Sequence, residues 1–168
     1  MWRCGSLFEL RNLALLTAVL GVAVLATAFG FQHLGGLDPC VLCVYQRWPW
    51  VAVIALGLLT YLVGGSIGRG LVVLTILALL VGAGIAGFHV GVELHWWAGT
   101  AECGGQSSAE MSVEALKQLL LATPVTRCDE VAWSLGGISM AGYNGIVSMA
   151  ATLVLAIALT ASKGRARR

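Results

Sequence analysis

Four stretches of the chain are almost entirely apolar, and shorter polar segments separate them. They cover about residues 13–31, 44–63, 71–97 and 138–160. Roughly 20 residues of helix cross a hydrocarbon core about 30 Å thick, and each stretch is close to that length. Helices are the expected form because open sheets would leave unpaired backbone groups in lipid. The pattern therefore predicts an all-α membrane protein built as a bundle of four transmembrane helices.

Composition supports a single membrane domain over residues 1–168. Hydrophobic residues make up 58% of the chain and charged residues only 11%, and the mean hydropathy is +0.88. Soluble domains carry about 25% charged residues, so most of this surface does not face water. The basic residues cluster toward the ends of the chain and form no stripe, which argues against a nucleic-acid partner.

The placement of basic residues predicts the orientation of the bundle. An even number of spans puts both termini on one side. The basic residues expected on that side are Arg3, Arg11, Arg69, Lys163, Arg165, Arg167 and Arg168. The other side carries only Arg47, Lys117 and Arg127. The positive-inside rule then places both termini in the cytoplasm, and it places the two loops, about residues 32–47 and 98–137, on the outer face.

The second outer loop has a helical pattern of its own. Ser107 and Glu110 fit a capping box, and apolar residues then recur on one helical face until Pro124 ends the pattern. The segment predicts a short amphipathic helix. It either lies on the membrane surface or packs on the protein's own spans, and the sequence leaves both open.

The five cysteines divide between the two faces of the membrane. Cys40 and Cys43 form a Cys-x-x-Cys pair in the first outer loop, and Cys103 and Cys128 lie in the second. Disulfides persist in an oxidising outer compartment. Cys4 is alone on the reducing side, where we expect a free thiol without a role. The pairing of the four outer cysteines is open, because they allow three connectivities.

The Cys-x-x-Cys pair indicates redox or metal chemistry. A zinc site of four cysteines usually contains two such pairs, and this chain has one, so no metal site is predicted. Arg47 follows Cys43 by four residues and would lie one helical turn away on the same face. Its permanent charge would stabilise a thiolate at Cys43. The competing role for Arg47 is an interfacial anchor that reaches the lipid headgroups.

Two segments resemble the DsbB family of bacterial inner-membrane disulfide-forming proteins. The first is FQHL at residues 31–34 followed by PCVLCVYQR at residues 39–47, and the second is CDEVAWSLGGISM at residues 128–140. The predicted spans, their orientation and the second-loop cysteines agree with that family, and the resemblance covers nearly the whole chain. The first segment is specific, whereas Cys-x-x-Cys alone would be weak.

The resemblance implies a multi-pass protein of the bacterial inner membrane. Such a protein reoxidises DsbA, a periplasmic protein of the thioredoxin fold, and passes two electrons to ubiquinone or menaquinone, and so indirectly to the respiratory chain. By analogy, reduced DsbA attacks Cys103, whose partner in the resting disulfide is Cys128. Cys128 then exchanges with Cys40, and Cys43 is released as a thiolate that reacts with the quinone ring. Arg47 would stabilise that charged pair.

The end of the third stretch departs from the family pattern. The family has a histidine near the quinone just after the glutamate that matches Glu93, and this chain has Leu94 there. His89 and His95 are the candidate substitutes. His89 and Glu93 are four residues apart and could pair on one helical face, and ionisable residues at membrane depth are functional candidates. A hydrated interfacial pair without a role is the competing interpretation.

Two other functions stay open on the sequence. One is a relative of different direction or partner, such as a vitamin K epoxide reductase type enzyme. The other is a non-enzymatic membrane protein with two structural disulfides, although bridges across longer loops would stabilise it more. The chain carries no dinucleotide-binding fingerprint. Gly82, Gly84 and Gly87 in the third stretch instead predict close packing between helices.

Overall fold

The computed structural model describes residues 3–100, 103 and 126–167, and within these ranges it describes side chains between residues 10 and 162. In chain order its elements are α1 (Arg3–His33), α2 (Val41–Tyr45), α3 (Arg47–Val63), α4 (Gly65–Glu93), β1 (Ser134–Leu135), β2 (Ile138–Ser139) and α6 (Met140–Arg167).

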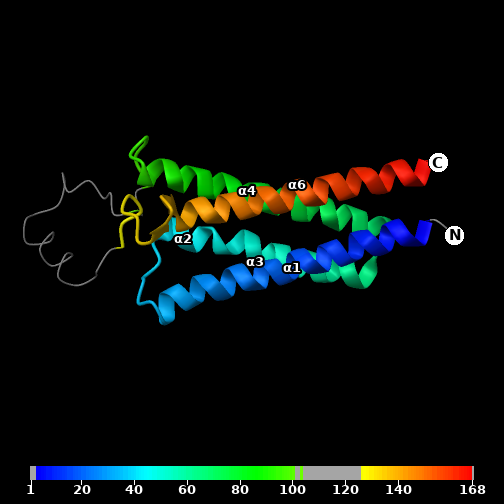
Figure 1. Ribbon diagram of the computed structural model, residues 1–168, viewed down its shortest axis with the longest axis horizontal. Coiled ribbons are helices and arrows are strands. Elements are labelled where there is room, and N and C mark those ends of the chain that lie inside the picture. Colours follow the sequence, from blue (N-terminus) through cyan, green and yellow to red (C-terminus); the bar gives the residue numbers. More distant parts are fainter. Residues whose placement is uncertain (1–2, 101–102, 104–125, 168) are drawn as a thin grey trace, which may run out of the picture.

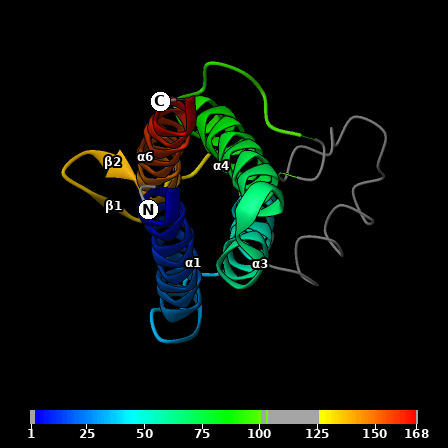
Figure 2. The same cartoon turned by 90° about the vertical axis from the view of Figure 1, so that its right-hand side faces the viewer.

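The long helices form one bundle. α1 packs on α3, α3 on α4, α4 on α6, and α6 returns to α1, so the helices follow chain order around the bundle (Figure 2). Both termini lie at one end, and α2 and the two strands lie at the other (Figure 1). Four segments of the described chain are long and apolar enough to cross a membrane, namely Leu10–His33, Val41–Val63, Gly65–Glu93 and Met140–Ser162. The predicted four-helix bundle is confirmed.

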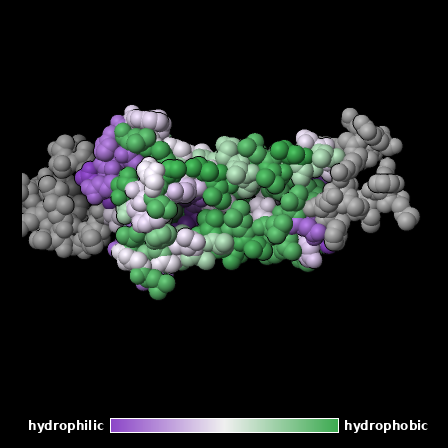
Figure 3. All heavy atoms as spheres, viewed as in Figure 1, coloured by the Kyte–Doolittle hydropathy of each residue, from purple (hydrophilic) through white to green (hydrophobic). Residues whose placement is uncertain are grey.

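The surface of the bundle is apolar along most of its length. Large hydrophobic side chains point outward from every long helix, among them Leu16, Leu62, Ile67 and Ile157. Figure 3 shows this apolar band, with hydrophilic residues gathered at the end that carries the loops. In water such a surface would be costly, so its place is in lipid. Residues 107–120, for which the sequence predicts the amphipathic helix, lie outside the described residues.

Helix α4 is longer at its start and shorter at its end than the predicted third stretch. It begins at Gly65, because Gly64 and Gly65, with φ of 62° and 61°, make the whole turn from α3 by themselves. Glycine adopts this backbone without a steric penalty. At the other end the chain turns back after Glu93, and the Trp97 indole donates to the Phe88 carbonyl at 3.0 Å. Where lipid begins and ends on each helix stays a prediction.

One glycine brings α1 and α3 into close contact. A Cβ added to Gly57 of α3 would lie 2.7 Å from the carbonyl oxygen of Ala14 and 2.9 Å from Cβ of Ala18, both on α1. Membrane helices lack a hydrophobic force that drives them together, so small residues at the interface provide packing instead.

The glycines of α4 meet the sequence prediction only in part. A Cβ on Gly82 would lie 3.2 Å from Pro49, which confirms close packing at this position. The prediction is wrong for Gly84 and Gly87, where no atom lies within 4 Å of the place of a Cβ. These two residues are rotated away from Gly82 around the helix, so they face away from the neighbouring helices.

Pro49 separates the cysteine pair from the long helix that follows it. A proline ring clashes with the carbonyl four residues earlier, here that of Tyr45, and so interrupts a helix. Accordingly, α2 ends at Tyr45 and α3 begins at Arg47. Pro49 then lies in the first turn of α3, where its missing N–H costs no helical hydrogen bond. The pair therefore lies on a short helix of its own.

A small hairpin precedes the last helix, where the predicted stretch began at residue 138. Ser134 pairs with Ser139 and Leu135 with Ile138. Gly136 and Gly137 connect the strands with φ of 58° and 79°, which is the two-residue turn that suits a twisted hairpin. α6 therefore begins only at Met140.

Candidate functional site

The fold brings Cys40, Cys43, Cys103 and Cys128 into one cluster. Cys103 and Cys128 form a disulfide, which selects one of the connectivities left open by the sequence. Cys40 packs in the same cluster as that disulfide, together with Leu42 and Val92. Cys40 is 5% exposed and Cys128 is fully buried. The two cysteine pairs, separate in sequence, are therefore neighbours in space.

Several hydrogen-bonding groups surround the Cys40 sulfur. Cys40 caps the N-terminus of α2, and the backbone N–H of Cys43 donates to its Sγ at 3.3 Å. The Sγ atoms of Cys40 and Cys43, both thiols, share a hydrogen bond at 2.9 Å. The bond from the Cys43 thiol, with smaller contributions from His89 and the Cys43 backbone, lowers the pKa of Cys40 to about 4 against the opposing effect of burial. These contacts favour the thiolate form of Cys40, which is the reactive form of a cysteine.

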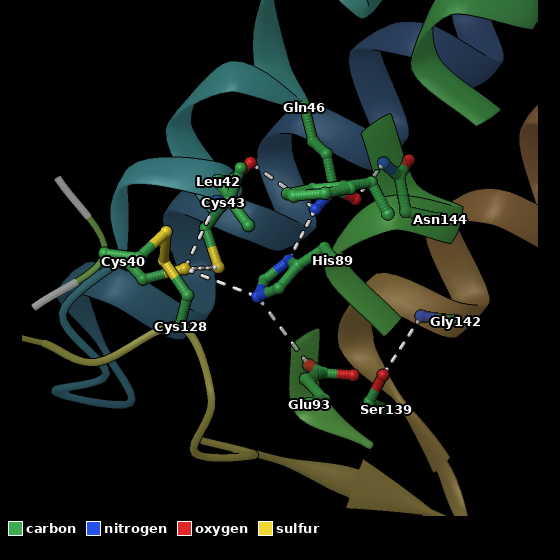
Figure 4. Close-up of polar contacts among 12 residues, drawn as sticks. Cys40, Leu42, Cys43, Gln46, His89, Glu93, Cys128, Ser139, Gly142 and Asn144 are labelled. Carbon is green, nitrogen blue, oxygen red and sulfur yellow. Dashed lines mark hydrogen bonds and ion pairs between the residues drawn. A yellow bond between two sulfur atoms is a disulfide. The ribbon is translucent and has the colours of Figure 1, made fainter. Parts of the chain in front are cut away.

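His89 and Glu93 of α4 border the cysteine pair (Figure 4). The His89 Nε2 atom lies 3.6 Å from Cys40 Sγ and 3.9 Å from Glu93 Oε1. The side chains of His89 and Glu93 are only 3% and 7% exposed. The helical spacing correctly placed them on one face, and a role for the pair in the site stays a prediction.

Behind His89, a chain of side-chain amides crosses the bundle. Gln46 Nε2 lies 2.8 Å from His89 Nδ1, and Asn144 Nδ2 donates to Gln46 Oε1 at 2.6 Å. The Trp50 indole N–H donates to Asn144 Oδ1 at 2.6 Å. These residues come from α3 and its cap, α4 and α6, so the chain ties three spans together at the level of the cysteines.

A cavity of about 390 Å³ lies beside the cluster. Its apolar wall comes largely from α1, including Leu20, Val24 and Phe31. The polar residues that line it include Cys40, Cys43, Gln46, Arg47, His89, Glu93 and Asn144. α6 also contributes to the lining, with residues that include Ala141, Asn144 and Val147. The volume lies within the usual range of small-molecule sites, about 300–1,000 Å³.

Arg47 contacts α1. Its Nη1 donates to Gln32 Oε1 at 2.8 Å, and its guanidinium carbon lies 4.7 Å from the centre of the Phe29 ring. Arg47 and Cys43 both line the cavity, but among the described residues no hydrogen bond joins them. The contacts that stabilise a thiolate are thus found at Cys40, where the sequence argument had expected them at Cys43. A role of Arg47 toward a ligand in the cavity stays a prediction.

His95 lies apart from this cavity. It lines a second hollow next to Cys103, together with Arg127 and Asp129. The Arg127 guanidinium donates to the Asp129 carboxylate at 2.9 and 2.6 Å, and this contact lowers the pKa of Asp129. Of the two candidate histidines, His89 is the one placed beside Cys40 and Cys43.

Three residues could hold a thiophilic metal ion. One ligand atom each of Cys40, Cys43 and His89 lie within 4.8 Å of one another. Two thiolates and an imidazole with an open fourth position form a donor set that suits zinc. The sequence predicted no metal site, because the chain has a single Cys-x-x-Cys pair, and the third donor, His89, lies far from that pair in the sequence.

Sequence reasoning missed Gln46, Asn144 and Trp50. A signal existed for Asn144, since a side-chain amide within an otherwise apolar span is costly and marks a functional candidate. In the sequence, Trp50 is indistinguishable from the other apolar residues of its span. The partners of all three lie on other helices, and no local pattern reveals them.

The chain is similar to proteins of disulfide bond formation. Residues 10–158 match the family described as "Disulfide bond formation protein DsbB". Disulfide bond formation protein B of Methylobacillus flagellatus is 30% identical over 144 residues, 82% of this chain and 85% of that protein. The protein of the same name from Aromatoleum aromaticum is 29% identical over 166 residues, 93% of this chain and 96% of that protein. An uncharacterised protein of Rickettsia prowazekii is 27% identical over 154 residues, 90% of this chain and 88% of its own length. No solved structure matches the chain.

Proposed function

Since the chain belongs to the DsbB family of disulfide bond formation proteins, we propose that it oxidises a DsbA-like dithiol protein and passes the electrons to a membrane quinone. Membership of that family and the four apolar segments make the chain a multi-pass membrane protein. The proposal adds the electron donor, the electron acceptor and the path between them.

The observation that carries the proposal is the position of Cys40. It packs in one cluster with the Cys103–Cys128 disulfide, and it also lines the cavity together with Cys43. Thiol–disulfide exchange needs direct contact between sulfurs. A disulfide that served only stability would not need a dithiol beside it.

The proposed path moves two electrons through four sulfurs. A thiolate of the partner attacks Cys103, the Cys103–Cys128 bond breaks, and Cys128 leaves as a thiolate. When Cys40 and Cys43 are oxidised, Cys128 attacks Cys40, so that the Cys40–Cys43 bond breaks and Cys43 leaves with the electron pair. The partner's second thiol resolves the mixed disulfide with Cys103 and completes the partner's oxidation. Cys103, freed by that step, then attacks Cys128, which restores the Cys103–Cys128 bond and releases Cys40 as a thiolate. Cys40 and Cys43 form their disulfide again, and the two electrons that this oxidation releases pass to the quinone.

The cavity offers what a quinone substrate requires. When bound, a quinone accepts two electrons and two protons. The apolar wall from α1 suits a lipid-soluble ring and excludes water, while Gln46, Arg47 and His89 supply polar atoms at the wall shared with Cys43. Glu93, 3.9 Å from His89, adds a carboxyl group to the lining. Ubiquinone and menaquinone both meet these requirements.

The proposal includes an orientation in the bacterial inner membrane. The described cysteines of the site lie at the end of the bundle opposite to the termini (Figure 1), and most basic residues belong to the terminal end. The positive-inside rule supports cytoplasmic termini and a periplasmic site, where a DsbA-like protein of the thioredoxin fold would dock over Cys103.

A quinone titration tests the proposal. The purified protein, reduced and in detergent, is mixed with a short-chain ubiquinone, and the visible spectrum and the quinone absorbance are followed. We expect a visible charge-transfer band and stoichiometric loss of quinone. Both should disappear in Cys43→Ala and persist in Cys4→Ala, whose cysteine lies at the other end of α1.

Three outcomes would count against the proposal. Absence of quinone reduction at any pH would favour the non-enzymatic protein with structural disulfides. Equal reduction in Cys43→Ala would remove the dithiol from the path. Reduction of vitamin K epoxide by the protein, without oxidation of a reduced thioredoxin-fold dithiol protein, would favour the vitamin K epoxide reductase type of enzyme.

A further inference from the structure

The amide chain behind His89 has a fixed direction. An indole N–H only donates hydrogen bonds, so the Asn144 oxygen must face Trp50, as it does at 2.6 Å. The Asn144 amino group then faces the Gln46 oxygen at 2.6 Å. The Gln46 amino group is left to face His89 Nδ1 at 2.8 Å. Each amide orientation follows from its neighbour, beginning at Trp50.

This direction determines the tautomer of His89. Nδ1 receives a hydrogen bond from Gln46 and therefore carries no proton, so the ring proton is on Nε2. Acceptors near Nε2 include Cys40 Sγ at 3.6 Å and Glu93 Oε1 at 3.9 Å. His89 thus presents a donor to the Cys40 sulfur.

The same nitrogen would be needed to bind a metal ion. Metal coordination by Nε2 uses its lone pair, which moves the ring proton to Nδ1 and requires an acceptor in front of Nδ1. Gln46 presents its amino group there. Rotating the Gln46 amide would place its amino group against that of Asn144, and rotating Asn144 as well would place two donors face to face at Trp50.

We propose that Gln46, held by Asn144 and Trp50, is a positioning residue that makes His89 a donor to Cys40 and keeps the Cys40–Cys43–His89 cluster from binding zinc. A buried dithiol next to an imidazole is a strong zinc site in donor type and spacing. Zinc bound there would block exchange at both sulfurs. The amide chain favours the redox use of the cluster over its use as a metal site, and this inference requires neither the quinone nor the dithiol partner.

Zinc titration of single-residue variants tests the inference. The full-length protein in detergent, kept reduced without oxygen, competes for Zn²⁺ with a coloured chelator. Gln46→Glu replaces the donor at Nδ1 with an acceptor of the same shape, and we expect zinc affinity to rise about 10- to 100-fold. Adding His89→Phe to Gln46→Glu should remove the gain, because the gain acts through the imidazole.

The matched control is Gln32→Glu. It introduces the same charge next to Arg47, which lines the cavity, and among the described residues Gln32 forms no hydrogen bond with His89. We expect its zinc affinity to equal that of the parent protein. An equal rise in Gln32→Glu would mean that charge alone attracts zinc, and no rise in Gln46→Glu would mean that the donor at Nδ1 is unimportant. Either result would overturn the inference.

Nitrogen-15 NMR of the imidazole gives a second, independent measurement. We expect the parent protein to carry the His89 proton on Nε2, with the resonance assigned by its loss in His89→Phe. Trp50→Phe keeps a smaller aromatic ring and removes the N–H donor, so a population with the proton on Nδ1 should appear. A parent protein with the proton on Nδ1 would refute the inference, even if Gln46→Glu did not fold. Because neither measurement involves quinone, failure of this inference would not contradict the proposed function, and failure of the proposed function would not contradict this inference.

Discussion

The Nε2 atom of His89 lies 3.6 Å from the Cys40 sulfur, although 49 positions separate the two residues in the chain. The contact exists because the end of α4 packs against α2, where Pro49 has detached the cysteine pair from α3. A donor from one span thereby stabilises charge on the sulfur that borders the second-loop disulfide.

Removing that donor should change the reactivity of Cys40 with pH. The pKa of Cys40 is lowered to about 4, so its thiolate is present above that pH and is lost as the pH falls through it. In His89→Phe the pKa should rise. The alkylation rate of Cys40, followed by mass spectrometry of the reduced protein, should therefore fall away at a higher pH than in the parent protein.

Cys43→Ala provides the comparison for this experiment, because the Cys43 thiol is the largest cause of the lowered pKa. It should shift the alkylation profile further than His89→Phe does. The thiolate also contributes stability that is full above the pKa of an unfolded thiol, near 8.5, and that declines as the pH falls toward 4. Identical profiles in all three proteins would contradict the assignment of the thiolate to Cys40.

Oxidation of the partner protein and reduction of the quinone should be separable by mutation, because each depends on a different cysteine pair. Cys103→Ala should abolish oxidation of a reduced thioredoxin-fold protein, because the partner attacks Cys103. The same variant should still reduce added quinone once its Cys40–Cys43 pair has been reduced chemically. Stopped-flow absorbance for the quinone and gel-shift trapping of free thiols for the partner measure the two steps. Full turnover of the partner protein by Cys103→Ala would sink the proposed order of exchange.

Arg47→Gln should weaken the use of quinone without loss of the fold. Hydrogen bonds to charged groups contribute about 1.5–3 kcal/mol, so we expect kcat/KM for quinone to fall about 10-fold or more. Gln32→Ala removes the 2.8 Å partner of Arg47 but keeps the charge, and its effect should be smaller. Unchanged kinetics in Arg47→Gln would leave Arg47 as an interfacial anchor only.

Gly57→Ala should destabilise the bundle. Its new Cβ would lie 2.7 Å from the backbone oxygen of Ala14, and the α1 backbone would have to move away. Overpacking of this kind costs about 1–3 kcal/mol, which a lower Tm in detergent would report. Gly84→Ala is the matched control, because nothing lies within 4 Å of its Cβ position. A Tm loss of the same size in both variants would show that helix contact is not the cause.

Local signals in the sequence were enough for the bundle and for most of the site. Long apolar stretches identify spans because each residue contributes to hydropathy independently of its neighbours in space. Cys40 and Cys43 were found by their spacing, and His89 and Glu93 by their charge at membrane depth. The predicted start of the third stretch, residue 71, was too late. Residues 65–70 are rich in glycine, which is typical of a loop, but in the structure they form the first turns of α4.

The amino-acid sequence by itself determined that this chain spans the membrane four times and carries two cysteine pairs on one side. Only the tertiary structure decided that Cys40 borders the Cys103–Cys128 disulfide, that Arg47 turns to Gln32, and that Gln46 directs its amino group at His89. These relations depend on how α2, α3, α4 and α6 pack, and on the direction of each hydrogen bond. Packing and direction are properties of pairs of residues far apart in the chain, so no local pattern encodes them.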